Sequence, residues 1–127
     1  MLEADIRALP GASPPTAVMC HDPIASAANA AVLQPFADWL AAVCAHNREN
    51  PSRRVGIKLD MKEPAAVEPV CALLCERAAE LCELGMQVWL NADVLTGPFG
   101  ARSAFNPGEF LRCCDVVRKA VAARGGG

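Results

Sequence analysis

Hydrophobic and polar residues alternate along three stretches of the chain, at 1–6, 55–62 and 87–94. A period of two is typical of a β-strand that buries one of its faces. Residues 16–20 are a shorter strand candidate, and His21 follows directly after it. In the three long stretches the polar positions form a face of their own, which must lie against something other than an apolar core.

Apolar residues recur at helical spacing in three further segments. The first runs from residue 35 to about residue 48. The second begins between residues 64 and 69 and ends at Gly85, which suits the left-handed conformation that follows many helices. The third begins after Asn106, which we expect to cap it while Glu109 reaches back. We expect this last helix to fray from Arg124 onward.

The order strand, strand, helix, strand, helix, strand, helix predicts an α/β domain with a mostly parallel sheet. An open sheet with helices on both faces has continuously apolar strands, whereas these strands keep one polar face. Such a face suits the interior of a barrel near its mouth. Because a complete (β/α)8 TIM barrel takes about 250 residues, we expect an incomplete barrel over residues 1–124, with about four strands and three helices, and a flexible glycine tail at 125–127.

Four strands leave two unpaired sheet edges, which a soluble protein has to cover. We therefore expect either a homodimer that forms through the open sheet edges or a truncated gene model. In the second case Met1 would be an internal methionine of a longer protein.

Composition narrows the classes of partner. Hydrophobic residues make up 53% of the chain and charged residues 20%, the balance of a folded domain. The formal net charge of -2 offers no basic surface for nucleic acid. No apolar run approaches the ~18 residues of a membrane span, and residues 1–5 lack the pattern of an export signal. We expect no nucleic-acid partner and no transmembrane segment.

The seven cysteines are an odd number, which argues against a pure disulfide framework. Cys71, Cys75 and Cys82 share a helical face with apolar residues, so we expect reduced thiols that pack as small hydrophobic groups. We expect the same packing role for Cys113 and Cys114, and the cysteine spacing differs from that of a zinc finger. Reduced thiols indicate the cytoplasm.

Carboxylates recur on the polar faces of the predicted strands. Glu3 and Asp5 are two residues apart, which places their Cβ atoms about 7 Å apart on one side of a strand. Asp60 and Asp93 repeat the theme near the carboxyl ends of their own strands, where barrels place active sites. Converging carboxylates need a compensating charge. The set therefore predicts a site for a hard divalent cation, Mg²⁺ or Ca²⁺.

Basic and aromatic residues share these polar faces. Lys58 and Lys62 are available for an anionic group of a substrate, and His21 is a candidate for proton transfer. Trp89 and Asn91 lie on the same side as Asp93; Trp89 suits either a filled barrel core or a stacked ligand. A surface belt of salt bridges explains the same charges without any site, and periodicity alone leaves both interpretations open.

Four segments of the chain resemble the menorin family: 1–6, 19–23, 56–62 and 88–95, followed by Gly97-Pro98. Menorin domains are similar to the phospholipase C-like phosphodiesterases, of which the glycerophosphodiester enzymes are (β/α)8 barrels. The resemblance implies that Glu3 and Asp5 bind a divalent cation together with Asp60, two residues before Lys62. It also implies that His21 is an acid or base.

Two departures limit what this resemblance implies. The phosphodiesterase mechanism uses a second histidine on the first barrel strand, whereas Met1 falls within what would be the second strand. The later strands are also missing, so we expect the 127-residue chain to be inactive.

Two hypotheses about function follow. The first is a menorin-like domain derived from a metal-dependent phosphodiesterase, with a phosphodiester-like small molecule as its ligand. The alternative is a non-catalytic secreted or cell-surface module that binds a protein partner and uses the barrel as a scaffold. The family resemblance points to the extracellular space, in conflict with the cysteine usage.

Overall fold

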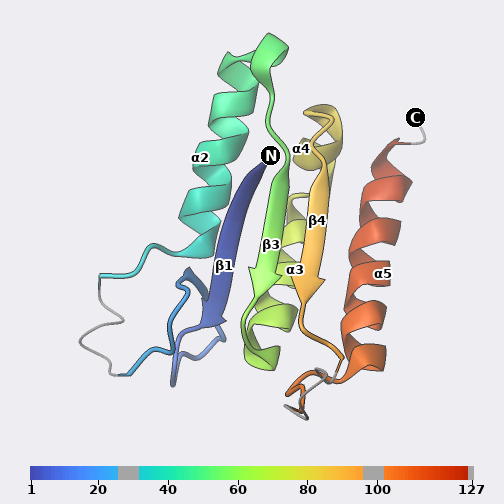
Figure 1. Cartoon of the computed structure of the whole chain (residues 1–127). Helices are drawn as coiled ribbons and strands as arrows, with labels where there is room; N and C mark the ends of the chain where they lie inside the picture. Colours follow the sequence, from blue (N-terminus) through green and yellow to red (C-terminus); the bar gives the residue numbers. More distant parts are fainter. Residues whose placement is uncertain (26–31, 96–101, 126–127) are drawn as a thin grey trace.

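A four-stranded sheet forms the centre of the molecule (Figure 1). The computed structural model describes residues 1–25, 32–95 and 102–125. The strand order is β2-β1-β3-β4; β1, β3 and β4 are parallel, and β2 runs antiparallel to β1. The strands have these bounds: β1 Leu2–Ala8, β2 Ala17–Met19, β3 Ile57–Met61 and β4 Val88–Ala92. The α/β class is confirmed, as are the three strands predicted from the alternation and the shorter strand predicted at residues 16–20.

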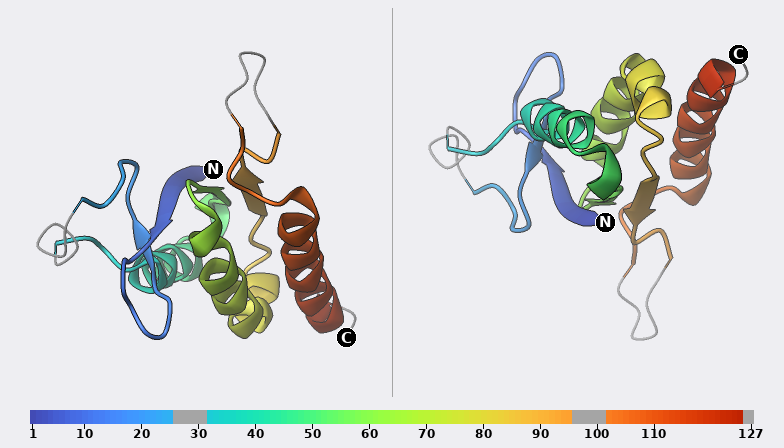
Figure 2. Two further views of the ribbon diagram at one scale, coloured as in Figure 1. Left: turned by 90° about the horizontal axis from the view of Figure 1, so that it is seen from below. Right: turned by 90° about the horizontal axis from the view of Figure 1, so that it is seen from above.

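The helices cover one face of this sheet, as both end-on views show (Figure 2). Helix α2 connects β2 to β3, α3 and α4 connect β3 to β4, and α5 follows β4. No helix of the described segments lies on the other face of the sheet (Figure 2). The helices have these bounds: α2 Phe36–Glu49, α3 Val67–Glu76, α4 Ala78–Glu83 and α5 Pro107–Gly125, with single 3-10 turns at η1 Pro51–Arg53 and η2 Pro64–Ala66.

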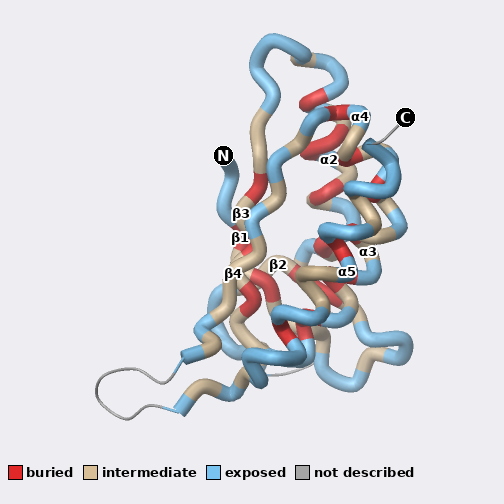
Figure 3. Tube along the Cα trace, turned by 90° about the vertical axis from the view of Figure 1, so that its right-hand side faces the viewer, coloured by how far each residue is buried: buried red, intermediate tan, exposed pale blue. Residues whose placement is uncertain are grey.

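The apolar positions of the strands form the core with these helices (Figure 3). In β3, Ile57, Leu59 and Met61 are buried, whereas the alternate residues are not. In β1, Ala4 and Ile6 are buried in the same way. Each Å² of apolar surface that folding removes from water stabilises the folded chain by about 25 cal/mol. The period-two pattern therefore fixes which face of the sheet meets the helices.

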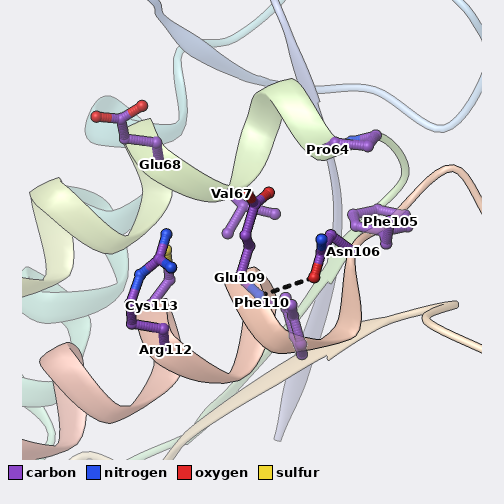
Figure 4. A pocket seen from close by; sticks show the side chains of 9 residues that line it. All are labelled: Pro64, Val67, Glu68, Phe105, Asn106, Glu109, Phe110, Arg112 and Cys113. Carbon is purple, nitrogen blue, oxygen red and sulfur yellow. Dashed lines mark hydrogen bonds between the residues drawn. The ribbon is translucent and has the colours of Figure 1, made fainter.

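Two helix boundaries were predicted correctly. Gly85 has φ +58° after α4, a conformation that costs glycine little. Asn106 caps α5, because its Oδ1 accepts a hydrogen bond of 3.1 Å from the backbone N–H of Glu109 (Figure 4).

The other boundaries differ from the prediction. The single helix expected up to Gly85 is two helices, since Arg77 has φ -91° and ψ 4° between them, outside the helical range. Helix α5 also continues through Gly125, and fraying from Arg124 onward stays a prediction. Gly126 and Gly127 lie outside the described residues, as does the predicted loop at 96–100.

The described residues form an open sheet with β2 and β4 at its edges, and they close no barrel. None of their helices is long and apolar enough to span a membrane.

Asn47 is the one polar residue that is fully buried among the described residues. Its Nδ2 donates to the carbonyl oxygen of Val55 at 2.8 Å, and its Oδ1 accepts from the N–H of Val55 at 2.7 Å. The side chain therefore ties the last turn of α2 to the segment that leads into β3. The amide group thus satisfies the N–H and the carbonyl oxygen of Val55, which no neighbouring strand of the described segments pairs with.

We expect Asn47→Ala to lower the free energy of unfolding by about 2–4 kcal/mol, because it leaves both part-buried backbone groups of Val55 without their partners. Urea unfolding followed by circular dichroism measures this change. Asn50→Ala is the matched control, since Asn50 bonds only within its own turn, to His46, and should cost less than about 1 kcal/mol. Equal losses in the two variants would contradict the assigned role of Asn47.

Candidate functional site

The polar face of the sheet carries two rows of side chains that cross β1, β3 and β4. Parallel strands in register place equivalent residues side by side, and each position here is polar or aromatic. The two rows, in the order β1, β3, β4, are Glu3–Lys58–Trp89 and Asp5–Asp60–Asn91. Sequence periodicity predicted that these six side chains share a face, and the strand register makes them neighbours.

Three carboxylates meet at the centre of these rows. Glu3, Asp5 and Asp60 each offer an oxygen, and the three oxygens lie within 4.8 Å of one another. Among the described residues this is the one group of three metal-ligating side chains so close together. Oxygen donors of this kind are the ligands of hard divalent cations. We call Glu3, Asp5 and Asp60 the carboxylate cluster.

Two lysines neutralise part of this negative charge. Nζ of Lys62 lies 2.8 Å from Oδ2 of Asp60 and 3.0 Å from Oδ1 of Asp5, so it bridges β1 and β3. Nζ of Lys58 lies 2.8 Å from Oε1 of Glu3. These contacts hold three like charges close together, an arrangement that would otherwise be repulsive.

His21 completes the cluster from the edge of the sheet. The antiparallel pairing of β2 with β1 returns the chain to the carboxylates, and Nδ1 of His21 lies 2.8 Å from Oδ2 of Asp5. The histidine side chain is 70% exposed, so its other ring nitrogen is accessible to a ligand. A carboxylate that holds one nitrogen of an accessible imidazole is typical of a proton-transfer pair.

Two residues that sequence reasoning missed hold His21 in place. Nε of Arg7 donates to the carbonyl oxygen of His21 at 3.0 Å, and Arg7 also forms an ion pair of 3.2 Å with Glu63. Glu63 in turn accepts a hydrogen bond of 2.7 Å from the N–H of Ala8. The signal was present, because Arg7 continues the odd-numbered polar positions of Glu3 and Asp5, but the strand was predicted to end at residue 6.

The charges of the cluster shift its proton affinities. Partial burial raises the pKa of Asp5, but hydrogen bonds from His21 and Lys62 outweigh this effect and hold the pKa below its ordinary value of 3.8. The hydrogen bond to Asp60 raises the pKa of Lys62 above its ordinary 10.5. At neutral pH both groups are therefore charged, and the ion pairs are fully formed.

The remaining predicted site residues lie in three different environments. Nδ2 of Asn91 donates to Oδ1 of Asp60 at 3.0 Å, which joins Asn91 to the cluster. Trp89 is 59% exposed on the sheet face that the helices leave open. Asp93 is separate from the cluster and lines a cavity of about 420 Å³ that Lys62 and Arg102 also line.

A second polar pocket lies elsewhere and is lined by none of these residues. It has a volume of about 390 Å³ and lies between the first turns of α3 and α5, with Glu68 and Arg112 on opposite walls (Figure 4). The ionisable residues of the carboxylate cluster project instead from the sheet face that the helices leave open. The cluster is therefore the candidate site, on account of its chemistry and not of its depth.

Comparison with known proteins relates the chain to a protein family and to curated sequences. A family model described as the Menorin N-terminal domain matches residues 1–125. Protein FAM151B of Homo sapiens is 37% identical over 113 residues, which is 87% of this chain and 35% of that relative. The chain thus spans about a third of the length of this curated relative. No solved structure matches the chain.

We expect the ion pairs of Asp5 to make folding sensitive to acid. The pKa of Asp5 is lowered in the folded chain, so the unfolded chain binds more protons. The contribution of Asp5 is fully present above about pH 3.8 and is lost as the pH falls through the lower folded value. The thermal midpoint of Asp5→Asn should therefore fall less than that of the wild type between about pH 5 and about pH 2.5, a range that brackets the ordinary aspartate pKa of 3.8.

Asp38→Asn is the control for this measurement, because Asp38 lies exposed in the first turn of α2, away from the cluster. It should keep the wild-type dependence on pH. An identical pH profile for wild type and Asp5→Asn would contradict a charge-paired Asp5.

Proposed function

The chain belongs to the menorin family, and we propose that its carboxylate cluster is a Mg²⁺ or Ca²⁺ site of the phosphodiesterase type. The observation that carries the proposal is the approach of three carboxylate oxygens, from Glu3, Asp5 and Asp60, to within 4.8 Å of one another. Hard oxygen ligands of two neighbouring parallel strands suit either cation. A bound cation would polarise a phosphodiester and stabilise the charge that develops on it.

Lys62 has two partners in this proposal. Without a cation its ammonium group bridges Asp5 and Asp60 and balances their charge. A cation on the same carboxylates would free that ammonium group, which then pairs with the negative charge of a phosphate. Lys58, held by Glu3, contributes a second positive charge along the same face.

His21 is the proton-transfer residue of the proposed site. Asp5 holds its Nδ1 at 2.8 Å, so the exposed Nε2 is the nitrogen that exchanges a proton with the reacting oxygen. Arg7 and Glu63 are positioning residues that act through the backbone of His21 and through β1. Asn91 orients Asp60 through its hydrogen bond, as outer partners of metal ligands commonly do.

The same proposal includes the fold. We infer that the open sheet is part of a (β/α)8 barrel whose interior is the polar face. Support comes from three parallel strands that lie side by side in chain order and from helices that all cover the opposite face. In a barrel the exposed Trp89 would face the interior, next to the candidate site.

A non-catalytic binding module is the second candidate, and one observation favours it. Every carboxylate of the cluster already has a lysine or a histidine as its partner, so each has a polar contact without any cation. In that case the row of charges and the exposed Trp89 would contact a protein partner.

Cation titration of the purified chain distinguishes the two candidates. We expect Mg²⁺ or Ca²⁺ at about 100 times its Kd to raise the free energy of unfolding by about 2.7 kcal/mol. Asp5→Asn and Asp60→Asn should lose most of this gain, whereas Asp38→Asn should keep it. A cooperatively folded chain with no gain, or an equal gain in Asp60→Asn, would contradict the metal site and favour the binding module.

Catalysis is tested on a longer menorin protein that includes this domain. We expect metal-dependent hydrolysis of glycerophosphodiesters that falls at least 100-fold in the counterparts of Asp5→Asn and His21→Gln, since each removes a direct participant. Cation binding without hydrolysis would retain the metal site and refute the enzyme.

A further inference from the structure

Four of the seven cysteines gather where α3 packs against α5. Cys71 and Cys75 are four residues apart on α3, so they lie on one face of that helix. Cys113 and Cys114 are on α5, and Figure 4 shows Cys113 on the side of α5 that faces α3. All four are free thiols. This group lies on the helical side of the sheet, whereas the carboxylate cluster lies on the other side.

Three of these thiols line one small cavity. Cys71, Cys75 and Cys113 contribute to a pocket of about 280 Å³, with Glu68, Ala72 and Val116 as the other lining residues. Cys71 is buried and Cys113 is half-buried, so the cavity connects a buried thiol to the surface. Cys114 differs, because it lines the apolar groove between α5 and β4.

The thiols of Cys71 and Cys75 are protonated at neutral pH. Burial, together with the neighbouring Cys113, Cys114 and Cys75, raises the pKa of Cys71 to about 12. Burial also raises the pKa of Cys75. Protonated thiols are poor nucleophiles, so this environment disfavours disulfide exchange. A soft metal ion, in contrast, removes the proton from a thiol that coordinates it.

We propose that Cys71 and Cys113 bind one Cu(I) ion across the α3–α5 interface, with Cys75 beside them. Two neutral thiols lose two protons to the solvent and become two thiolates that coordinate the ion, with no change in oxidation state. Three of the six residues that line the cavity are cysteines, and soft sulfur ligands select Cu(I) over Mg²⁺ or Ca²⁺.

The number of available sulfurs favours Cu(I) over zinc. Structural zinc sites use four ligands in a tetrahedron. Within the described ranges no three of the thiols bring their sulfur atoms within 4.8 Å of one another, so they do not form a preassembled site of three or four sulfurs. Cys113 lines the same cavity as Cys71 from the opposite helix, so it supplies the second member of the proposed pair. A d10 ion that accepts two thiolates fits this pair.

The test is a titration of the fully reduced chain with Cu(I) under anaerobic conditions, in competition with a chromophoric Cu(I) chelator. We expect one equivalent of Cu(I) to bind with a thiolate-to-metal charge-transfer absorption. Cys113→Ser should weaken the apparent affinity at least 10-fold. Cys114→Ser is the matched control, because it changes the adjacent residue, which lines a different cavity, and it should bind Cu(I) as the wild type does.

Each other result overturns the proposal. Equal affinity in wild type and Cys113→Ser, or equal losses in Cys113→Ser and Cys114→Ser, would exclude the assigned ligands. Cys71 is buried, and Cys71→Ser can fail to fold, so the half-buried Cys113 and Cys75 are the deciding positions. Binding of Zn²⁺ at one equivalent without binding of Cu(I) would exclude a two-sulfur site.

Discussion

The burial of alternate side chains of β1 and β3 against a single layer of helices determines where the charges of this chain lie. Ile6, Leu59 and Met61 are removed from water on that side. Their neighbours in sequence must then project from the opposite side, because successive side chains of a strand alternate. Parallel pairing in register brings Asp5 next to Asp60. The carboxylate cluster is thus a geometric consequence of the way the core is built.

Such closeness has an energetic cost that the cross-strand lysines offset. Lys62 reaches two carboxylates on two strands, and Lys58 reaches a third. These ammonium groups reduce the repulsion between the carboxylates, and they are also the groups that a cation would displace. Lys62 and a cation would therefore compete for Asp5 and Asp60, and the strength of the lysine contacts would limit the affinity that the proposed site can reach.

Much of this arrangement could be predicted from local patterns, and the rest depends on contacts between distant segments. Alternation identified the polar faces, Gly85 ended a helix by its left-handed conformation, and the Asn106 cap followed from residue type. The break at Arg77 escaped prediction because apolar spacing continues through it. The contact of Arg7 with His21 escaped it too, because only the pairing of β1 with β2 brings these residues together.

The pairing of β1 with β2 makes the position of His21 independent of the turn that connects these two strands. Backbone pairing within the sheet fixes the position of His21. The paired residues run from Ile6–Met19 to Ala8–Ala17, and the N–H of Cys20 donates to the carbonyl oxygen of Asp5. The connection at residues 9–16 lies beyond the last of these pairs. Insertions there leave the histidine where it is, so this turn is free to diversify in length and composition among descendants of the chain while the chemistry beside it stays constant.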